Sequence, residues 1–363
     1  MNRGHYRGHP RGHDPIPEEC QWPYRRQRSV SSEQLVSPGS GGLPVVHHSR
    51  YVCELPPRHR FPMGKFPRVL QVLLQDQVIS EQQVWTPELV SEDVLRGVHT
   101  AEYIHSFLSG TVEEEAQRRT GFPWSPGLVR RCRYETGGTL LAAEVALQRG
   151  LACSTAGGTH HAYPDRGSGY CLLNDLAVTA QHLRSSSSPL SSSSSSSSPS
   201  GRKVLIVDLD VHQGDGTAFI FKDEPGVFTF SVHSQKNFPL RKQRSDLDVG
   251  LPDATEDGRY LSTGKLAFLI EAHLPGLLDS FRPDLVLYDA GVDPHQDDEL
   301  GRLRLTDRGL YQRDLYVMKT VVARGVPIAT VVGGGYARDV DKLAVRHSIV
   351  HRAATQVWKE CGL

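Results

Sequence analysis

The chain has 363 residues, and its 41 Lys and Arg residues balance 41 Asp and Glu residues, so the formal net charge is zero. This balance excludes an overall basic field for holding nucleic acid, and we expect no direct nucleic-acid binding. No apolar stretch approaches the roughly 20 residues of a membrane-spanning helix, and the N-terminus lacks the apolar core of a secretory signal. The six cysteines are scattered without a CxxC pair, which predicts reduced thiols in the nucleus or cytoplasm.

Two segments of biased composition interrupt an otherwise ordinary globular pattern. Residues 1–50 are rich in Arg, Pro, Gly, Ser and His and lack apolar periodicity, which predicts a disordered tail. Residues 185–200 read SSSSPLSSSSSSSSPS, and polyserine cannot bury enough apolar area to offset its chain entropy. Because the same α/β pattern continues on both sides, we interpret this run as a loop insertion within one domain over residues 51–363, not as a domain linker.

Helix and strand patterns alternate along that domain. Helices are predicted over Pro67–Gln77, Thr136–Gly150 and Asp175–Arg184. Short, nearly continuous apolar runs indicate buried parallel strands, and there are five of them: Leu151–Thr155, Val204–Leu209, Val227–Val232, Leu285–Tyr288 and Ile328–Val332. The alternation predicts a single α/β domain with a central parallel sheet flanked by helices on both faces.

Each of the five apolar runs ends in a cluster of His, Asp, Tyr or Gly residues. In open α/β sheets, ligands bind at the carboxyl ends of the strands, so five clusters at that position predict one shared site. In chain order the clusters are GGTHH at 157–161, DLDVHQGDG at 208–216, SVH at 231–233, DAGVD at 289–293 and GGGY at 333–336.

The pair Asp210 and His212 suggests a metal site. Residues two apart on a strand point to the same side, so these two side chains can share one cation. Asp293 would complete a set of one His and two carboxylates that leaves a coordination position open, as catalytic metals require. Oxygen and nitrogen ligands without thiolate suit Zn²⁺ or Fe²⁺. Asp208 follows four apolar residues and should be buried, where a carboxylate needs a histidine or a cation as partner.

Three further side chains could handle protons or charge at the same site. His160 and His161 are adjacent imidazoles, which suit general acid–base catalysis near neutral pH. Tyr336 follows three glycines at a strand end. Its phenol could donate a hydrogen bond to a substrate oxygen on which negative charge develops.

The segments GGTHHAYPDRGSGYCLLND, VLIVDLDVHQGDGTAFIF, DLVLYDAGVD and GGGYARDV together resemble the zinc-dependent histone deacetylase family. The resemblance covers about residues 59–356 and is strongest to the class IV-like branch and its bacterial relatives. It implies an arginase/deacetylase-like fold, in agreement with the elements above. It also implies a hydrolase that removes acetyl or longer acyl groups from lysine side chains of proteins, histones among them, with a role in chromatin regulation.

The resemblance assigns two ions to named residues. One catalytic Zn²⁺ would be held by Asp210, His212 and Asp293. A structural K⁺ would be held by a second set that shares residues with the first: Asp208, Ser231 and Val232, together with the backbone of Asp210 and His212.

The same resemblance assigns the proton chemistry and the substrate channel. Asp208 would orient His160, and Asp215 would orient His161, which we favour as the proton shuttle. Tyr336 would stabilise the transition state. The acyl-lysine channel would be formed by four residues: Gly169, Tyr170, Phe238 and, at its mouth, Leu300. Tyr170 departs from the Phe that is usual in the family, and Asp215 departs from the Asn of the animal class IV pattern.

Three alternatives remain beside a protein-lysine deacylase. A deacetylase of polyamines would favour Glu where this chain has Leu300, although the acidic run 297–299 lies next to it. An arginase-like binuclear manganese enzyme needs more carboxylates around the Asp210–His212 pair. An inactive scaffold would be expected to lose a metal ligand or Tyr336, and neither is lost. Because the class IV branch includes enzymes that remove fatty acyl groups, we expect medium or long acyl-lysine peptides to be better substrates than acetyl-lysine peptides.

Overall fold

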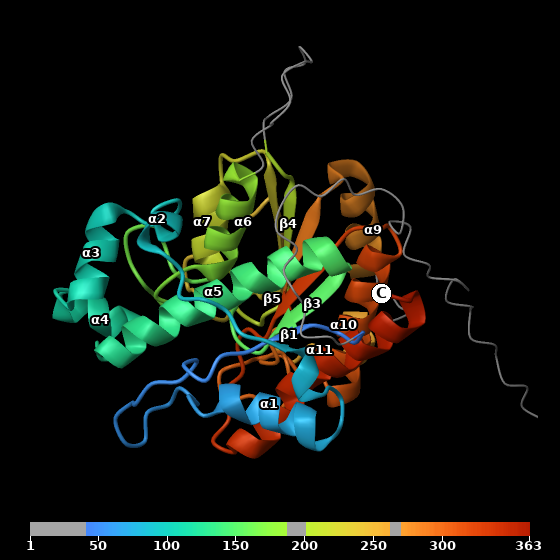
Figure 1. Ribbon diagram of the computed structural model, residues 1–363, viewed down its shortest axis with the longest axis horizontal. Coiled ribbons are helices and arrows are strands. Elements are labelled where there is room, and N and C mark those ends of the chain that lie inside the picture. Colours follow the sequence, from blue (N-terminus) through green and yellow to red (C-terminus); the bar gives the residue numbers. More distant parts are fainter. Residues whose placement is uncertain (1–40, 187–200, 262–269) are drawn as a thin grey trace, which may run out of the picture.

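The computed structural model describes residues 41–186, 201–261 and 270–363 (Figure 1). The predictions for residues 1–40 and for most of the polyserine run therefore lie outside the described residues. Within the described ranges, every helix is too short or too polar to span a membrane. Cys53, Cys132, Cys153 and Cys171 are free thiols, whereas Cys361 is disulfide-bonded, contrary to the expectation that all six cysteines are reduced.

A single parallel sheet of eight strands, in the order β2-β1-β3-β8-β7-β4-β5-β6, forms the centre of the described structure. All five strands expected from apolar runs are present, because runs of mostly buried residues suit a sheet covered on both faces. The strands are β1 (Val45–Val46), β2 (Val84–Trp85), β3 (Leu151–Ser154), β4 (Val204–Asp208), β5 (Val227–Ser234), β6 (Leu247–Leu251), β7 (Leu285–Asp289) and β8 (Ile328–Val331).

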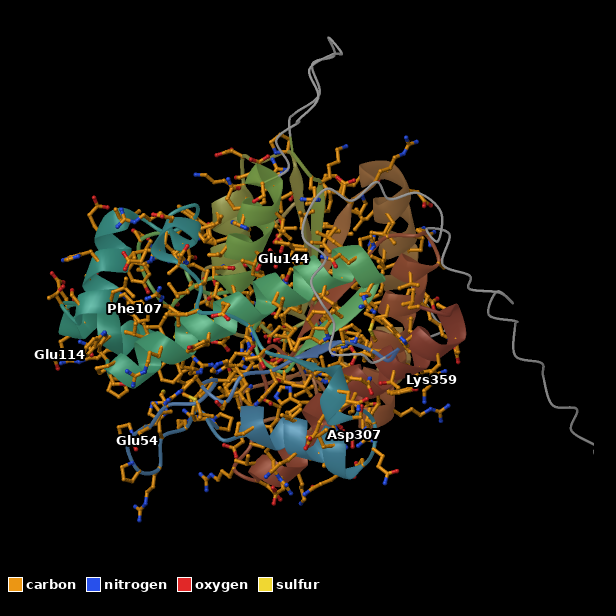
Figure 2. All side chains as sticks on the ribbon, viewed as in Figure 1. Glu54, Phe107, Glu114, Glu144, Asp307 and Lys359 are labelled. Carbon is orange, nitrogen blue, oxygen red and sulfur yellow. The ribbon has the colours of Figure 1, made fainter. Side chains whose placement is uncertain are left out.

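Helices pack on both faces of the sheet, as predicted (Figure 1). Alternate residues of β4 define the faces: Leu205 and Val207 pack in the core with α1, α9, α10 and α11, and Ile206 packs in the core with α5 and α6. Side chains fill the space between these layers (Figure 2). The helices are α1 (Lys65–Gln75), α2 (Glu92–Leu95), α3 (Ala101–Ser109), α4 (Glu114–Thr120), α5 (Pro126–Arg149), α6 (Asp175–Ser185), α7 (Asp215–Phe221), α8 (Asp257–Leu261), α9 (Ile270–Phe281), α10 (Asp307–Val322) and α11 (Val340–Cys361).

Helix α5 begins ten residues before its predicted start at Thr136. Ser125 caps it by accepting a hydrogen bond from Leu128 N, and Pro126 occupies the first helical position. The glycine pair inside it has a packing role, because a Cβ at Gly137 would lie only 2.2 Å from Glu88 O. The helix can therefore lie directly against the chain around Glu88.

The boundary between tail and domain lies earlier than residue 51. Val45 pairs with Val84 of β2 and with Cys153 of β3, so residues assigned to the tail belong to the sheet. His47 is buried, with Nδ1 2.7 Å from Thr155 Oγ1. A strand of two residues carries no periodic signal, which is why the sequence pattern did not reveal β1.

Candidate metal-dependent active site

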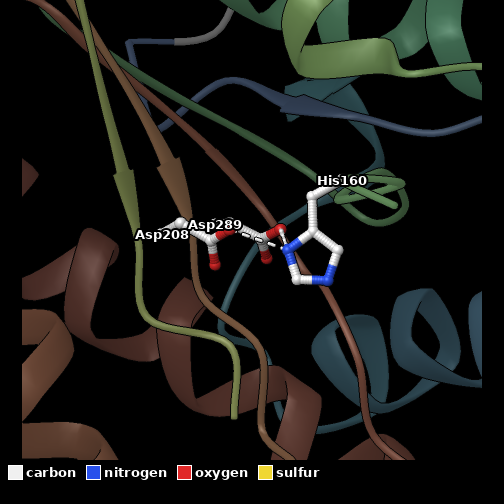
Figure 3. Close-up of side chains that lie close together, drawn as sticks. All are labelled: His160, Asp208 and Asp289. Carbon is white, nitrogen blue, oxygen red and sulfur yellow. Dashed lines mark hydrogen bonds and ion pairs between the residues drawn. The ribbon is translucent and has the colours of Figure 1, made fainter. Parts of the chain in front are cut away.

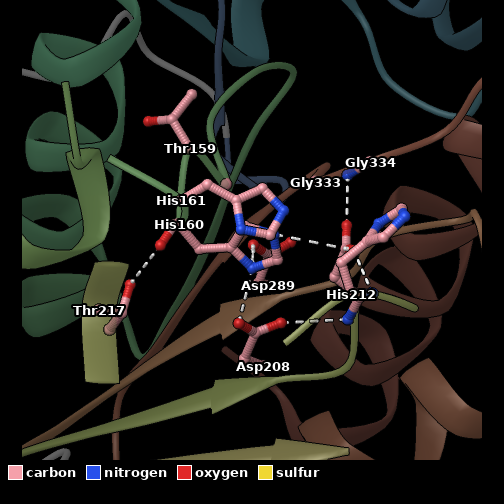
Figure 4. A network of polar contacts seen from close by, with 12 residues as sticks. Thr159, His160, His161, Asp208, His212, Thr217, Asp289, Gly333 and Gly334 are labelled. Carbon is pink, nitrogen blue, oxygen red and sulfur yellow. Dashed lines mark hydrogen bonds and ion pairs between the residues drawn. The ribbon is translucent and has the colours of Figure 1, made fainter. Parts of the chain in front are cut away.

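The side chains singled out in the sequence meet at the carboxyl ends of the central strands (Figure 4). The segments that follow β3, β4, β7 and β8 converge there, because parallel strands end at the same edge of a sheet. Helix α7 fixes the histidine pair, since Thr217 N donates a 3.1 Å hydrogen bond to His160 O. The site is therefore built from segments that are rigidly held by the sheet and by one helix.

Asp210, His212 and Asp293 form one buried cluster that could hold a metal ion. His212 Nδ1 lies 3.0 Å from Asp210 Oδ1 and 3.1 Å from Asp293 Oδ2. Backbone N–H groups orient the carboxylates, with Val211 N donating to Asp293 Oδ1 at 2.8 Å and Gly334 N donating to Asp210 Oδ2 at 2.7 Å.

The donor atoms of this cluster fit a divalent cation. Asp293 Oδ2 is buried, and within the described residues no well-aligned hydrogen bond reaches it. Burial lowers the pKa of His212, but the two carboxylates outweigh burial and raise that pKa to about 10. Burial and the charge of Asp210 raise the pKa of Asp293 to about 7. The raised pKa values of His212 and Asp293 favour protons on these side chains, which offset the negative charge of the buried carboxylates. A cation bound by the same ligands would displace these protons.

A second buried cluster lies beside the first and contains His160, Asp208 and Asp289 (Figure 3). His160 Nδ1 is 2.7 Å from Asp208 Oδ2 and 3.8 Å from Asp289 Oδ2. Asp208 and Asp289 are register partners on β4 and β7, so both carboxylates face the same imidazole. Burial disfavours charge on His160, but Asp208 and the neighbouring carboxylates outweigh it and raise its pKa well above the usual value.

Asp289 belongs to this cluster but was not among the site residues expected from the sequence. Neither of its buried carboxylate oxygens has a hydrogen-bond partner among the described residues. Burial and the charge of Asp208 raise the pKa of Asp289 well above its usual range. The signal that identified Asp208, an Asp directly after a buried apolar run, was equally present at Asp289.

His161 has a different environment from that of His160. Its Nδ1 lies 2.6 Å from Asp215 Oδ1, and the other oxygen of Asp215 accepts a 2.9 Å hydrogen bond from the Tyr163 hydroxyl. Burial and the charge of His160 outweigh Asp215 and lower the pKa of His161 to about 4. The two adjacent imidazoles therefore lie in unlike environments, which raise the pKa of His160 and lower that of His161.

Tyr336 lies above the metal-ligand cluster, with its ring centroid 6.4 Å from that of His212. Lys65, which is buried, donates to the carbonyls of Gly333 and Gly335 at 3.2 and 3.3 Å and so fixes the turn before Tyr336. Burial and the charge of Asp210 raise the pKa of the Tyr336 hydroxyl well above its usual value. The hydroxyl is therefore protonated and able to donate.

Three of the four residues expected at the channel, Gly169, Tyr170 and Phe238, lie near the rings of this site, whereas Leu300 contacts the segment before Phe238. The ring of Phe238 lies 4.9 Å from that of His161, and a Cβ at Gly169 would come within 2.9 Å of Phe238. The ring of Tyr170 lies 5.8 Å from that of Tyr336. Leu300 O accepts a 2.9 Å hydrogen bond from Asn237, the residue before Phe238.

The cavity at the inner end of the expected channel is small and is lined by both aromatic and charged side chains. A cavity of about 30 Å³ lies between Tyr336 and the tandem histidines, room for only a few water molecules. The buried side chains Lys65, Arg131 and Glu135 contribute to its lining. Arg131 Nη2 and Glu135 Oε1 form a buried ion pair at 2.8 Å in this lining.

The residues expected at a K⁺ site are also neighbours. Asp208 and Ser231 are register partners on β4 and β5, and Val232 follows Ser231. Asp208 Oδ1 accepts a 3.2 Å hydrogen bond from Asp210 N.

A family model for the histone deacetylase domain matches residues 59–351. The chain belongs to the histone deacetylase family. It is 49% identical over 317 residues to an uncharacterized protein of the cyanobacterium Picosynechococcus, covering 87% of this chain and all of that protein. It is 27% identical to histone deacetylase 2 of Arabidopsis thaliana, covering 86% of this chain and 80% of the relative.

The histone deacetylase fold is also found by comparison with solved structures. A histone deacetylase homologue from Aquifex aeolicus superposes with a TM-score of 0.67 at 21% identity, covering 88% of this chain and 84% of that one. The expected single α/β domain of deacetylase type is thus confirmed, and membership of the family makes the chain a hydrolase. That the chain belongs to the class IV branch stays a prediction.

Proposed function

We propose that this member of the histone deacetylase family removes acetyl groups from acetyl-lysine side chains of proteins, with one catalytic Zn²⁺ held by Asp210, His212 and Asp293. The observation that carries the proposal is this buried ligand set beside two histidines, each held by its own carboxylate, His160 by Asp208 and His161 by Asp215. A zinc ion in the set would polarise the amide carbonyl and make a water molecule more acidic.

The protein groups around that ion have different roles in proton transfer and in stabilising negative charge. His161 is the general base, because its imidazole is neutral and Asp215 holds Nδ1, which leaves Nε2 to accept a proton from the attacking water. The Tyr336 hydroxyl donates to the oxygen on which negative charge develops. The proton then passes from the histidine pair to the leaving lysine amine, and the products are a free lysine side chain and acetate.

The proposal commits to a short acyl group, in contrast to the sequence-based expectation of medium or long chains. Each buried CH₂ group contributes about 0.8 kcal/mol only if the pocket can enclose it. The cavity of about 30 Å³ next to Arg131 and Glu135 offers no such room, and it would place charged groups against the chain.

A second ion is part of the proposal. Asp208, Ser231 and Val232, with the backbone of Asp210 and His212, would bind a structural K⁺. The register of Asp208 with Ser231 supports this assignment.

The substrate could instead be a small acetylated amine such as a polyamine. The half-buried acidic residue Asp298 and the more exposed Asp297 and Glu299 favour a cation near the channel mouth. However, Asp298 accepts three backbone hydrogen bonds, Arg338 N donates to Glu299 Oε1, and Arg346 Nη2 lies 3.3 Å from Asp297 Oδ2. All three carboxylates are therefore already engaged. We therefore favour a protein substrate.

One experiment tests the proposed activity. The purified protein is assayed against acyl-lysine peptides and acetylated polyamines, with and without a chelator. We expect chelator-sensitive hydrolysis with the highest kcat/KM for acetyl-lysine peptides. A higher kcat/KM for acetylpolyamines would support the alternative substrate, and absence of hydrolysis would contradict the proposal.

A further inference from the structure

Asp298, in the loop between β7 and α10, has a carboxylate on which three backbone N–H groups converge. Leu300 N and Gly301 N each donate to Oδ1 at 2.8 Å. Tyr336 N donates to Oδ2 at 2.7 Å. Hydrogen bonds to an ionised acceptor are stronger than neutral ones, so this carboxylate ties two distant chain segments together.

The neighbouring residue Glu299 adds two contacts to the same segment. Glu299 N donates to Tyr336 O at 2.9 Å, and Glu299 Oε1 accepts a 3.0 Å hydrogen bond from Arg338 N. Both the N–H and the C=O of Tyr336 are therefore bound by residues 298–299. Upstream, Lys65 holds the carbonyls of Gly333 and Gly335.

These contacts determine where the Tyr336 hydroxyl lies. The Tyr336 ring lies among the rings of Phe61, Tyr170 and His212, whose centroids are 6.3, 5.8 and 6.4 Å away. These neighbours orient the ring, and the backbone contacts fix the chain from which it projects. An oxyanion donor must be placed to within a fraction of an ångström to be effective.

We propose that Asp298 is a positioning residue that places the Tyr336 hydroxyl for catalysis and links it to the channel mouth. This inference rests on the proposed function of the site. A carboxylate suits the task because it offers only acceptor positions, whereas the amide of Asn would turn an NH₂ group toward one of the donors.

The link to the channel mouth runs through a series of hydrogen bonds. Asp298 binds Leu300 N, and Leu300 O accepts from Asn237 Nδ2 at 2.9 Å. Asn237 Oδ1 in turn accepts from Phe238 N at 2.8 Å. The Asp298 carboxylate thus fixes Tyr336 beside the metal-ligand cluster. Through Leu300 and Asn237 it also fixes Phe238, which is expected to form a wall of the channel.

A double-mutant cycle of Asp298→Asn, Tyr336→Phe and the double variant tests this inference. The quantities measured are kcat for an acetyl-lysine peptide and the metal content of each protein. Asp298→Asn should lower kcat by about 10²-fold, the scale of a 1 Å displacement, with unchanged metal content. In the Tyr336→Phe background it should lower kcat by no more than about twofold, because the hydroxyl that it positions is absent. Losses of kcat that add in full in the double variant would show that Asp298 acts independently of the Tyr336 hydroxyl and would overturn the inference.

A matched control and a second variant keep the test decisive. Asp297→Asn makes the same change one residue earlier, on a side chain that is 67% exposed, and should leave kcat within about twofold. If Asp298→Asn does not fold, Glu299→Ala removes the acceptor of Arg338 N from a side chain that is 41% exposed. Glu299→Ala should lower kcat only when Tyr336 is present; an equal loss in both backgrounds overturns the inference.

The kcat of Tyr336→Phe alone separates the two hypotheses. Near-normal turnover of this variant would refute the proposed oxyanion role itself. A low kcat of Tyr336→Phe together with additive losses in the double variant would refute only the role of Asp298.

Discussion

His161 Nδ1 lies 2.6 Å from Asp215 Oδ1, although the two residues come from different segments, the turn after β3 and the first residue of α7. Asp215 is itself fixed by the Tyr163 hydroxyl. A carboxylate held in this way fixes the imidazole tautomer and leaves Nε2 free to accept a proton. The pair thus determines which of the two adjacent histidines can serve as a base.

Replacing the base or the oxyanion donor should slow turnover without removing the metal. We expect His161→Ala and Tyr336→Phe each to lower kcat by about 10²–10³-fold, the usual size of these contributions. Metal content should stay at the wild-type level, since neither side chain belongs to the ligand set. His105→Ala, on an exposed position of α3, serves as the control. Wild-type turnover in either active-site variant would refute the role assigned to it.

The acyl preference follows from the size of the inner cavity. We expect kcat/KM to fall in the order acetyl, octanoyl, myristoyl for otherwise identical lysine peptides, because the cavity measures about 30 Å³. The steady-state rates of the three peptides provide the measurement. Faster hydrolysis of the octanoyl or myristoyl peptide would show that the pocket opens behind Tyr336 and would restore the expectation drawn from the sequence.

Buried neutral histidines should make the fold acid-sensitive. His99 Nε2 accepts from Asn174 N at 3.0 Å and Nδ1 donates to Tyr163 O at 3.0 Å, and burial lowers its pKa from 6.5 to about 4. Because the unfolded chain takes up this proton first, stability is lost as the pH falls from about 6.5 to about 4. His99 alone should contribute up to roughly 1.4 kcal/mol per pH unit to the decline of the unfolding free energy.

Urea unfolding of the wild type and of His99→Gln between pH 6.5 and 4.5 measures this contribution. The variant should lose stability less steeply with falling pH, although its stability at pH 7 is lower. Equal slopes in the two proteins would mean that His99 is protonated in the folded state as readily as in the unfolded chain.

Deleting residues 186–199 should change neither the fold nor the catalytic efficiency. The chain on the two sides of the deletion is already joined, because Arg184 Nη1 donates to Arg202 O at 2.8 Å and Arg202 Nη1 donates to Leu183 O at 3.0 Å. We expect the melting temperature to fall by less than about 5 °C, corresponding to roughly 1–2 kcal/mol. A larger fall in a thermal unfolding experiment, or a loss of kcat/KM, would show that the polyserine run contributes to packing.

The central sheet could be predicted because its strands are continuous apolar runs with both faces covered. Strand β6 was missed because its alternating exposed residues, in the sequence LDVGL, resemble a loop of mixed polarity. The start of α5 was missed because the face that its first turns bury includes the charged residues Arg131 and Glu135, so residues 126–135 show no apolar stripe at helical spacing.

The main parts of the candidate site could also be predicted, since chemistry concentrates at strand ends. The pairing of His160 with Asp208 and of His161 with Asp215, implied by the family resemblance, agrees with the distances between them. Asp298 could not be found in this way. Its partners are backbone N–H groups of loops, and no residue pattern records which loops will meet.

The metal content of Asp293→Ala tests the central claim most directly. Wild-type protein, Asp293→Ala and the exposed control Asp297→Ala are purified identically, and bound metal per chain is measured together with hydrolysis of an acetyl-lysine peptide and the far-UV spectrum. We predict one tightly bound divalent ion and full activity in the wild type and the control. Asp293→Ala should stay folded and lose both the ion and the activity. Stoichiometric metal in a folded Asp293→Ala variant would contradict the assignment of the catalytic site.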